Sequence, residues 1–507
     1  MSDSQTSAVK SWKSNKGYIW ALLGSAVGFA NLLCFSAHCY KNGGGAFLIP
    51  LVLAYALLGI PMLMLESIIG QKFKLPIIGA YGRESGSIAK TFGWMSVIGC
   101  ITIGAFYMVL TGFSVAYTYF AVNSMIPADT ATFFKHTFLQ DSGSLTNWGS
   151  ISWQVALSTL LVALTTLFVM TRDIQKGIER VCSIFMPILI GLIGIFVLAT
   201  LFLPGAMEGI RRFLTPDFSH LSDFKLWRDV FGQLFFSLSL GLGIITGYAR
   251  YSKETINMRQ AMCWVAVGDF AIAFISGIVI FACIGYMSFT TQIPFDQIVK
   301  TDSTFEMGFV IFPMVLNTMG SAKIFFGALF FLCLVFKGLT GVFSIVESIA
   351  GNFEQEFSIS RNRSVIAALA IPSFLAIFFC MGNGQHLLGA IAPMVLGVNM
   401  LLAAMATIVF FILHNNTIRQ EMALQMGIAS ERKIKIIGYW MLAILLVIFI
   451  GTLQSEISEA GSLSMLIRWS WFAIALLFSW GLTQITKTQK IIEVKNDIII
   501  SIKTESL

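Results

Sequence analysis

Two apolar segments contain the residue types that bind small charged groups inside a membrane. In the first segment, 17–39, residues 24–31 read GSAVGFAN, which puts two glycines and the amide of Asn31 in the middle of an apolar run. Unwound backbone in a bilayer is tolerated only where protein or a watery cavity satisfies its polar groups. Freed carbonyls and helix ends at this depth bind ions and small charged groups. The segment therefore predicts a binding site near the membrane midplane.

A second segment, 229–250, is interrupted in the same way. Residues 235–243 read FFSLSLGLG, with two hydroxyls and two glycines in the middle of the segment. Small residues also allow close helix packing, which is the simpler explanation for one such segment. The two interruptions, however, fall at the first span of each half of the chain. Matching interruptions of this kind favour a transporter binding site over packing alone.

Composition places the chain in a membrane. Of 507 residues, 56% are hydrophobic and 12% are charged, about half the charged fraction of a soluble domain. Lys and Arg gather in alternate connectors, which puts both termini in the cytoplasm of a multi-pass protein of the inner or plasma membrane. These loops account for the net charge of +7, so nucleic acid is not an expected partner. Twelve spans are predicted, at 17–39, 45–70, 92–124, 151–171, 180–203, 229–250, 260–288, 322–353, 364–381, 387–413, 433–453 and 463–486.

Several ordered motifs resemble the neurotransmitter:sodium symporter family, in its bacterial amino-acid branch. The matching stretches are 24–31, 42–50, 176–180 (KGIER), 203–206 (LPGA), 216–218 (PDF), 233–243 with Tyr248, 276–281 and 338–340. The resemblance implies an all-α, leucine-transporter-type fold with a 5+5 inverted repeat, broken helices 1 and 6, and two additional C-terminal helices. The implied divisions are an N-terminal segment (1–16), two repeats (17–203 and 229–413, with an outer lid loop at 287–321), spans 11 and 12 (433–486) and a cytoplasmic tail (487–507).

The resemblance implies one sodium site beside the substrate. Its ligands would come from Ala26, Asn31, Ser237 and Asp269, and such oxygen ligands suit a hard cation. Asp269 carries a charge where the family has an amide. That carboxylate could strengthen cation binding, take up a proton, or pair with a buried cation, and carboxylates inside a membrane are usually functional.

The family's second sodium site is altered in this chain. Its implied positions are Gly24, Val27, Lys337, Thr340 and Gly341, so one hydroxyl is missing and a lysine is new. Lys337 lies roughly 20 Å from either end of its span at about 1.5 Å per residue, which is too far for its side chain to reach water. Its ammonium could replace the second sodium, move protons with Asp269, or form a structural pair with that acid. These alternatives remain open.

The substrate is expected between the broken halves of spans 1 and 6. Gly28 stands where monoamine carriers of the family have an aspartate, which implies a neutral amino acid. Leu242 and Gly341 are smaller than their counterparts in leucine-selective relatives, which favours a bulky or aromatic side chain. The implied substrate-binding residues are Ala26, Gly28, Phe29, Ala30, Ile103, Tyr107, Phe236, Ser239, Leu242, Gly341 and Ile345.

The gates differ from the family pattern. The charged outer pair is replaced by Cys34 and by Gln385 or His386. The implied gating residues are Phe236 and Tyr107 on the outer side and Trp12 on the inner side, with Lys10 meeting the acids of 354–356 and Glu66 bonding amides freed by the break in span 6. Chloride dependence is not expected, because Leu51 and Ala273 occupy two of the chloride-site positions.

The leading hypothesis is secondary active import of a neutral amino acid by alternating access, coupled to sodium through one retained site. The alternative is a sodium-independent or proton-coupled transporter or exchanger that uses Lys337. A ligand sensor that does not transport is a third, suggested by the missing outer gate. No enzymatic motif is found. The expected partners are a small amino acid, the lipid bilayer and possibly a second copy of the chain.

Overall fold

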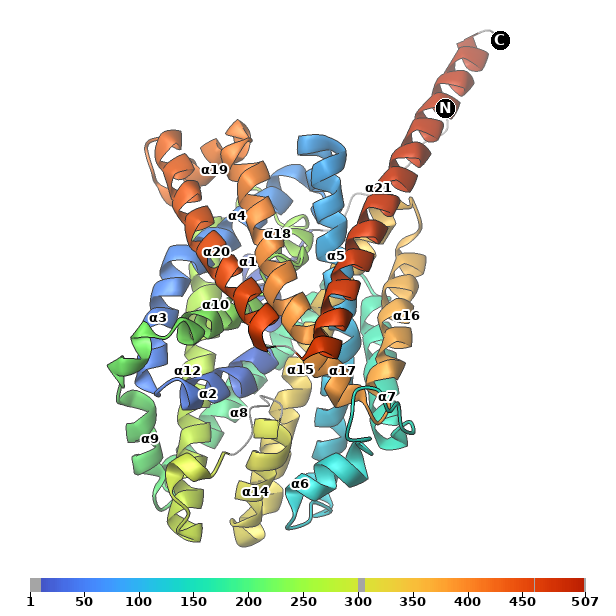
Figure 1. The fold of residues 1–507 in the computed structure, drawn as a ribbon. Helices are drawn as coiled ribbons and strands as arrows, with labels where there is room; N and C mark the ends of the chain where they lie inside the picture. The colour runs from blue at the N-terminus through green and yellow to red at the C-terminus, as the bar shows by residue number, and fades with distance from the viewer. Residues whose placement is uncertain (1–10, 300–305, 460, 506–507) are drawn as a thin grey trace.

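The chain is an all-helical bundle in a computed structural model that describes residues 11–299, 306–459 and 461–505 (Figure 1). Within these ranges there are helices and no β-strand. The long helices are Gly45–Phe73 (α3, η2, α4), Ile77–Val122 (α5), Trp153–Met170 (α7), Gln175–Leu201 (η4, α8), Met258–Thr291 (α12), Gly320–Glu356 (η8, α15), Arg361–Phe379 (α16), Gly384–Leu413 (α17, η9, α18, η10), Glu431–Glu459 (α20) and Ser462–Glu505 (α21).

Judged by helix length and composition, the described residues contain fewer candidate membrane spans than the twelve expected. Among the described residues, ten helices are long and apolar enough to cross a membrane, and the bent pair 15–26 and 30–41 makes up to eleven. The expected sixth span does not qualify because it is divided into two shorter helices, Phe224–Leu238 (α10) and Ile244–Ala249 (α11). The positions of the long helices agree with the predicted spans to within a few residues at most ends.

Both expected interruptions are present. The first span consists of Asn15–Ala26 (α1), then Ala30–Cys34 (η1) and Phe35–Lys41 (α2), with a bend of 55° between the two halves. In the other interrupted segment, α10 ends at Leu238 and α11 begins at Ile244. Ser239, Gly241 and Gly243 have φ angles of 55°, 77° and 71°, in the left-handed region that a right-handed helix does not visit. Backbone conformation therefore divides these spans.

Two helices extend beyond their predicted limits. α5 begins at Ile77, 15 residues before the predicted position 92, because it joins two helices across a kink at Ser85 and Gly86. α21 continues through the predicted tail as far as Glu505. Its last turns extend past the rest of the bundle (Figure 1). No glycine or proline follows Gly481 to end that helix.

Several short helices connect the long ones, and Thr130–Thr132 (α6), Ala206–Leu214 (α9) and Phe312–Asn317 (α14) lie at the end of the bundle opposite Asn416–Met426 (α19) (Figure 1). The loop expected to form a lid contains Phe295–Gln297 (η6), Met307–Ile311 (η7) and α14, and Phe295, Met307 and Phe309 are buried. The remaining connecting helices are Phe133–Phe138 (η3) and Phe218–Ser222 (η5).

The helix packing places the two interruptions at the centre of the bundle. α1 lies against α8, α12 and α15, while α11 lies against α4 and α15. α15 packs along most of α5, which makes this pair the principal scaffold beside the broken helices. Each broken half is therefore held by longer, continuous helices.

The break after α10 depends on glycine at position 241. A Cβ there would meet the carbonyl oxygen of Met400 at 2.9 Å, and its φ of 77° costs an L side chain about 1–2 kcal/mol. Gly241→Ala should therefore lower the apparent melting temperature of the purified protein in detergent. Gly232→Ala, in an open position within α10, is the matched control and should leave that temperature unchanged or raise it slightly. Equal effects of the two substitutions would contradict this account.

Candidate functional site

The break in the first span is closed by the Asn31 side chain. Its Oδ1 accepts a hydrogen bond from the backbone N–H of Gly28 at 2.8 Å. The backbone N–H of Asn31 donates to the Gly28 carbonyl at 3.2 Å. Gln233 of α10 donates from Nε2 to the carbonyl of Ala30 at 3.0 Å. These bonds satisfy backbone groups that a continuous helix would pair internally. They also fasten the two interrupted segments to each other.

Asp269 is the centre of a buried polar cluster. Its Oδ1 accepts from Asn31 Nδ2 at 2.7 Å, and its Oδ2 accepts from Ser237 Oγ at 2.6 Å. Asn31 Nδ2 also lies 2.9 Å from Ser237 Oγ. All three side chains are fully buried. Three of the four residues expected at the first sodium site thus contact one another, and the fourth, Ala26, lines the adjoining cavity.

Tyr55 is a member of this cluster that the sequence analysis missed. It begins the π-helical segment Tyr55–Gly59 (η2), and its hydroxyl donates to Asp269 Oδ2 at 2.5 Å. A buried tyrosine hydroxyl usually has a partner, so an isolated tyrosine in an apolar span was an available signal. The identity of that partner depends on how η2 packs beside α12. Asp269 is consequently bonded by donors from three separate spans.

Lys337 lies inside α15 with its side chain fully buried. Its Nζ has no hydrogen-bond partner in the described part of the chain. In particular, Asp269 makes no hydrogen bond with the Lys337 amine. Lys337 and Asp269 therefore do not form a direct ion pair in this structure.

The other positions of the altered site also come together. A Cβ on Gly24 would lie 3.4 Å from the Cβ of Thr340, so α1 and α15 touch at the level of Lys337. The Thr340 hydroxyl donates to the carbonyls of Phe336 and Lys337, both at 3.1 Å. Val27 is fully buried at the end of α1, with an extended backbone (ψ 97°).

A small cavity lies between the broken helices, α5 and α15. It measures about 20 Å³, which is room for roughly one water molecule. Ten of the eleven residues expected to bind substrate line it, and Phe29 is the exception because its ring packs on Tyr107 with centroids 5.1 Å apart. The lining also includes residues that the sequence analysis did not select, namely Ser25, Ile244 and Ser344.

Tyr107 occupies the space beside two glycines of the cavity. A Cβ on Gly28 would lie 2.5 Å from the Tyr107 hydroxyl oxygen, and one on Gly341 would lie 2.7 Å from the same atom. The absence of side chains at these positions thus makes room for Tyr107. The room expected at Gly341 for a bulky substrate side chain is filled by this ring.

A larger vestibule, of about 880 Å³, lies next to the cavity. Phe236 lines both spaces and is the residue between them. Pairs of an acid with a histidine or a lysine surround the vestibule: His38 with Asp229 at 3.4 Å, His386 with Asp141 at 2.9 Å, and Lys135 with Glu306 at 3.1 Å. Gln385, one of the expected gate positions, donates to Glu306 at 3.3 Å.

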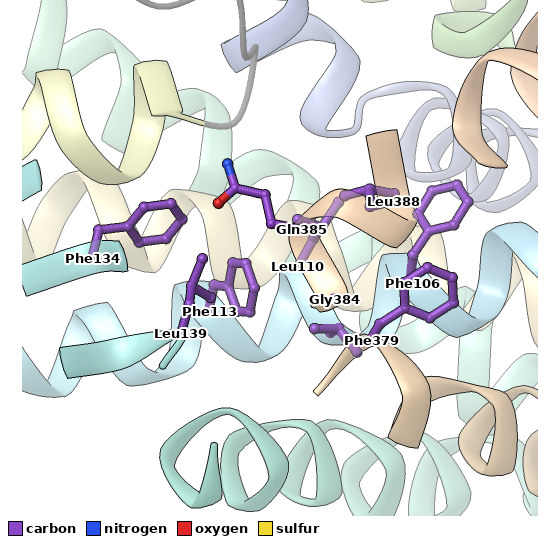
Figure 2. Close-up of a pocket in the computed structure, with 10 residues that line it drawn as sticks. Phe106, Leu110, Phe113, Phe134, Leu139, Phe379, Gly384, Gln385 and Leu388 are labelled. Carbon is purple, nitrogen blue, oxygen red and sulfur yellow. The ribbon is translucent and has the colours of Figure 1, made fainter. Parts of the chain in front are cut away.

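An apolar pocket adjoins this vestibule through Gln385 and Leu388 (Figure 2). Phenylalanine rings line it from α5, η3 and α16, and Figure 2 shows Gln385 as its polar side chain. Phe113 makes an edge contact with Phe138, at a centroid distance of 5.3 Å, which joins the loop helix η3 to the scaffold.

The segment before α1 is bonded to the bundle near Tyr248 and Glu179. Trp12 is buried, and its Nε1 donates to the carbonyl of Tyr248 at 2.9 Å. Glu179 accepts from the amides of Lys13 and Ser14 at 2.8 and 3.2 Å. Lys10, which was expected to contact the acids of 354–356, lies outside the described residues.

A buried charge network was also missed by sequence. Glu347 is an ion-pair partner of both Arg250, at 3.3 Å, and Arg361, and it accepts from the Tyr251 hydroxyl at 2.8 Å. Burial raises the pKa of Tyr251, which keeps that hydroxyl protonated as a donor. Glu354 lies further from the same arginines, at 3.7 and 4.0 Å. The acids of 354–356 therefore have arginine and lysine partners within the bundle, since Glu356 pairs with Lys90 at 2.5 Å.

Glu66 bonds the second break. Its Oε1 accepts from the amide of Gly241 at 2.8 Å, and its backbone carbonyl accepts from Thr246 at 3.3 Å. The side chain is buried on α4, opposite the left-handed residues after α10. This carboxyl group thus satisfies one amide that the interruption removes from the helix.

Glu347→Ala should destabilise the part of the bundle around Arg250 and Arg361. The substitution leaves two partly buried arginines without their principal acid, and losing one partner of a buried pair costs about 3–5 kcal/mol. We expect a clear fall in apparent melting temperature in detergent. Glu354→Ala, at a half-exposed and more distant acid, is the matched control and should lower it much less. A larger effect of the control would contradict the assignment of Glu347 as the central acid.

Comparison with known proteins places the chain in a family. It matches the sodium:neurotransmitter symporter family over residues 9–132 and 127–492. It is 36% identical to an uncharacterized sodium-dependent transporter of Methanocaldococcus jannaschii over 80% of this chain and 81% of that protein. Identity is 29% to an uncharacterized sodium-dependent transporter of Haemophilus influenzae (75% and 80% covered) and 27% to a sodium-dependent dopamine transporter of Caenorhabditis elegans (74% and 68% covered). The chain belongs to the sodium:neurotransmitter symporter family, whose members are sodium-dependent membrane transporters and not enzymes.

Proposed function

We propose that the protein imports a neutral amino acid by alternating access, driven by sodium bound at one site beside Asp269. The observation that carries this proposal is the convergence of Asn31, Ser237 and Asp269 next to a cavity formed by two broken helices. Such interrupted helices supply carbonyls and helix ends for ions and for the charged groups of a substrate. Gly28 provides no carboxylate to pair with a substrate amine, so the substrate is expected to carry a carboxylate of its own, as an amino acid does.

The oxygen atoms around Asp269 suit sodium. The carboxylate of Asp269 and the hydroxyl of Ser237 are hard ligands, which bind hard cations in preference to soft metals. Asn31 would add its side-chain oxygen, which in this structure accepts from the Gly28 amide. The negative charge of Asp269 is internal to the protein and fully buried. A cation beside it would be held by Coulomb attraction without a bound anion. This arrangement supports sodium coupling that does not require chloride.

Lys337 takes the place of the second sodium in this proposal. A fully buried ammonium is costly in a membrane unless its charge serves a purpose. Its helix touches α1 at Gly24, where the family's second cation would bridge the two spans. A positive charge on Lys337 would stand beside this contact between α1 and α15 and would not depend on the sodium concentration. One sodium would then accompany each substrate.

The two ends of the pathway support alternating access. A vestibule lies on one side of the cavity, separated from it by Phe236, while Trp12 and the Glu347 network close the other side. We infer that the vestibule faces outward and that both termini are cytoplasmic, with twelve spans arranged as a 5+5 repeat plus two. Movement of the broken helices against α5 and α15 would open each end in turn. Phe236 and Trp12 would be the gate residues.

Sodium dependence is the decisive test. Purified protein in proteoliposomes should take up members of a panel of labelled neutral amino acids under an inward sodium gradient, and uptake should fall to background when choline replaces sodium. The sodium response should have a Hill coefficient of about 1. Asp269→Asn, which removes the charge and keeps the size, should weaken apparent sodium affinity by at least about tenfold, equivalent to about 1.4 kcal/mol.

Lys337→Met distinguishes sodium-coupled transport from sodium-independent or proton-coupled transport through Lys337. It keeps most of the side-chain length but removes the charge, so uptake under a sodium gradient should fall by about tenfold or more. Cys333→Ala, one turn away on α15, is the matched control and should retain uptake. If sodium makes no difference to the unaltered protein while Lys337→Met abolishes transport, the alternative is correct and the lysine replaces sodium altogether. Ligand protection without any counterflow would instead identify a sensor.

A further inference from the structure

We infer that the cavity selects a small neutral amino acid whose side chain carries a hydroxyl group, with Ser25 as the residue that recognises it. This inference rests on the proposed function and names its substrate class. Three serines from three different segments line the cavity together with Tyr107 and apolar side chains: Ser25 at the end of α1, Ser239 in the break after α10, and Ser344 on α15. Each is more than nine-tenths buried.

The hydroxyl of Ser25 is the unusual member of this group. A serine in a helix commonly donates to a carbonyl three or four residues earlier, as Ser344 does to Gly341 at 2.7 Å. Ser239 donates to the carbonyl of Ser25 at 3.4 Å. The Oγ of Ser25, in contrast, is buried and has no hydrogen-bond partner within the described residues. Such a group is costly to bury unless something bonds to it.

The hydrogen-bonding capacity of the three serines defines the missing partner. Ser239 and Ser344 each use their one donor on a backbone carbonyl, so their oxygen atoms can only accept from a ligand. Ser25 retains both its donor and its acceptor positions. A ligand hydroxyl, which donates once and accepts, can satisfy Ser25 and one of its neighbours together. A purely apolar side chain would leave Ser25 unpaired.

The size of the cavity favours a short side chain. Tyr107 fills the space beside Gly28 and Gly341, and Leu242, Ile103 and Ile345 form apolar walls around the serines. Such walls suit a methyl group next to the hydroxyl. The bulky or aromatic side chain expected from the sequence would have to displace the Tyr107 ring from its contact with Phe29. The cavity now holds about one water molecule, so any amino acid must widen it, and serine and threonine would require the least widening among side chains that carry a hydroxyl group.

Threonine and valine provide the sharpest comparison because they have nearly the same shape and differ by a hydroxyl in place of a methyl group. Sites built to bond a substrate hydroxyl reject the analogue that lacks it more strongly than apolar pockets separate isosteres. In proteoliposomes containing the full-length protein and sodium, competition against a labelled substrate should show an apparent affinity for threonine at least about tenfold above that for valine, with serine close to threonine.

Ser25→Ala should reduce this threonine-to-valine ratio by about tenfold, through weaker threonine binding and unchanged or tighter valine binding. Ser276→Ala is the matched control, because Ser276 is also buried with an unpaired hydroxyl but lies on α12 outside the cavity. It should leave the ratio unchanged. Ser344→Ala is a second variant, expected to lower threonine affinity less than Ser25→Ala.

The outcomes separate this inference from the proposed function. Sodium-driven uptake of leucine or phenylalanine, with valine equal to or better than threonine, would support the transporter and overturn the hydroxyl selectivity. A ratio unaffected by Ser25→Ala would overturn the role of Ser25. If no neutral amino acid competes or is taken up, the proposed function itself fails. The threonine-to-valine ratio of the unaltered protein tests the selectivity even if a variant does not fold.

Discussion

The constraint on which this structure depends is that the backbone groups freed by a broken helix in a membrane need partners from protein or from water in a cavity, since the hydrocarbon offers none. Asn31 bonds the amide of Gly28, Gln233 bonds the carbonyl of Ala30, and Glu66 bonds the amide of Gly241. These three side chains come from three different spans. The interruptions are therefore stable only in the assembled bundle, and the bundle is held together through the interruptions.

The same bonds explain why ion and substrate positions are adjacent. Asn31 bonds Gly28 with its oxygen and Asp269 with its nitrogen, so one side chain links the backbone break to the buried charge. Tyr55 and Ser237 direct the remaining donors to the carboxylate. A change at Asp269 would thus alter the position of Asn31 and of the end of α1, which also carries Ser25 and Ala26 of the cavity. This connection gives the proposed coupling a short physical route.

The charges of the bundle fall into three groups with different environments. Asp269 and Lys337 lie at the centre, fully buried and not in direct contact. The Glu347 network closes one end with two arginines, and the His–Asp pairs surround the vestibule at the other. Buried pairs are strongly destabilised by loss of one partner, whereas exposed pairs contribute little. Loss of Glu347 should consequently cost more stability than loss of one partner in a more exposed pair around the vestibule.

Much of the fold was predictable from the sequence, because apolar length and interrupting residues act locally. The apolar runs gave most of the helices, and residues 24–31 and 235–243 gave the two breaks. The helical continuation of 487–505 was missed, although the lack of glycine and proline in that stretch was a usable signal. The resemblance to a family also indicated which of the scattered polar residues would meet at one site.

What the sequence by itself determined was the membrane class, the breaks, and the presence of an acid and a lysine at depth. Only the tertiary structure decided their partners, because each partner lies tens or hundreds of residues away in the chain. Tyr55 reaches Asp269 from 214 positions away, and Glu347 joins Arg250 from 97. The space beside Gly341 looked open in the sequence but is filled by Tyr107, since a glycine makes room for whichever side chain packs against it. Periodicity and composition are local properties, whereas the occupant of a gap is fixed by packing.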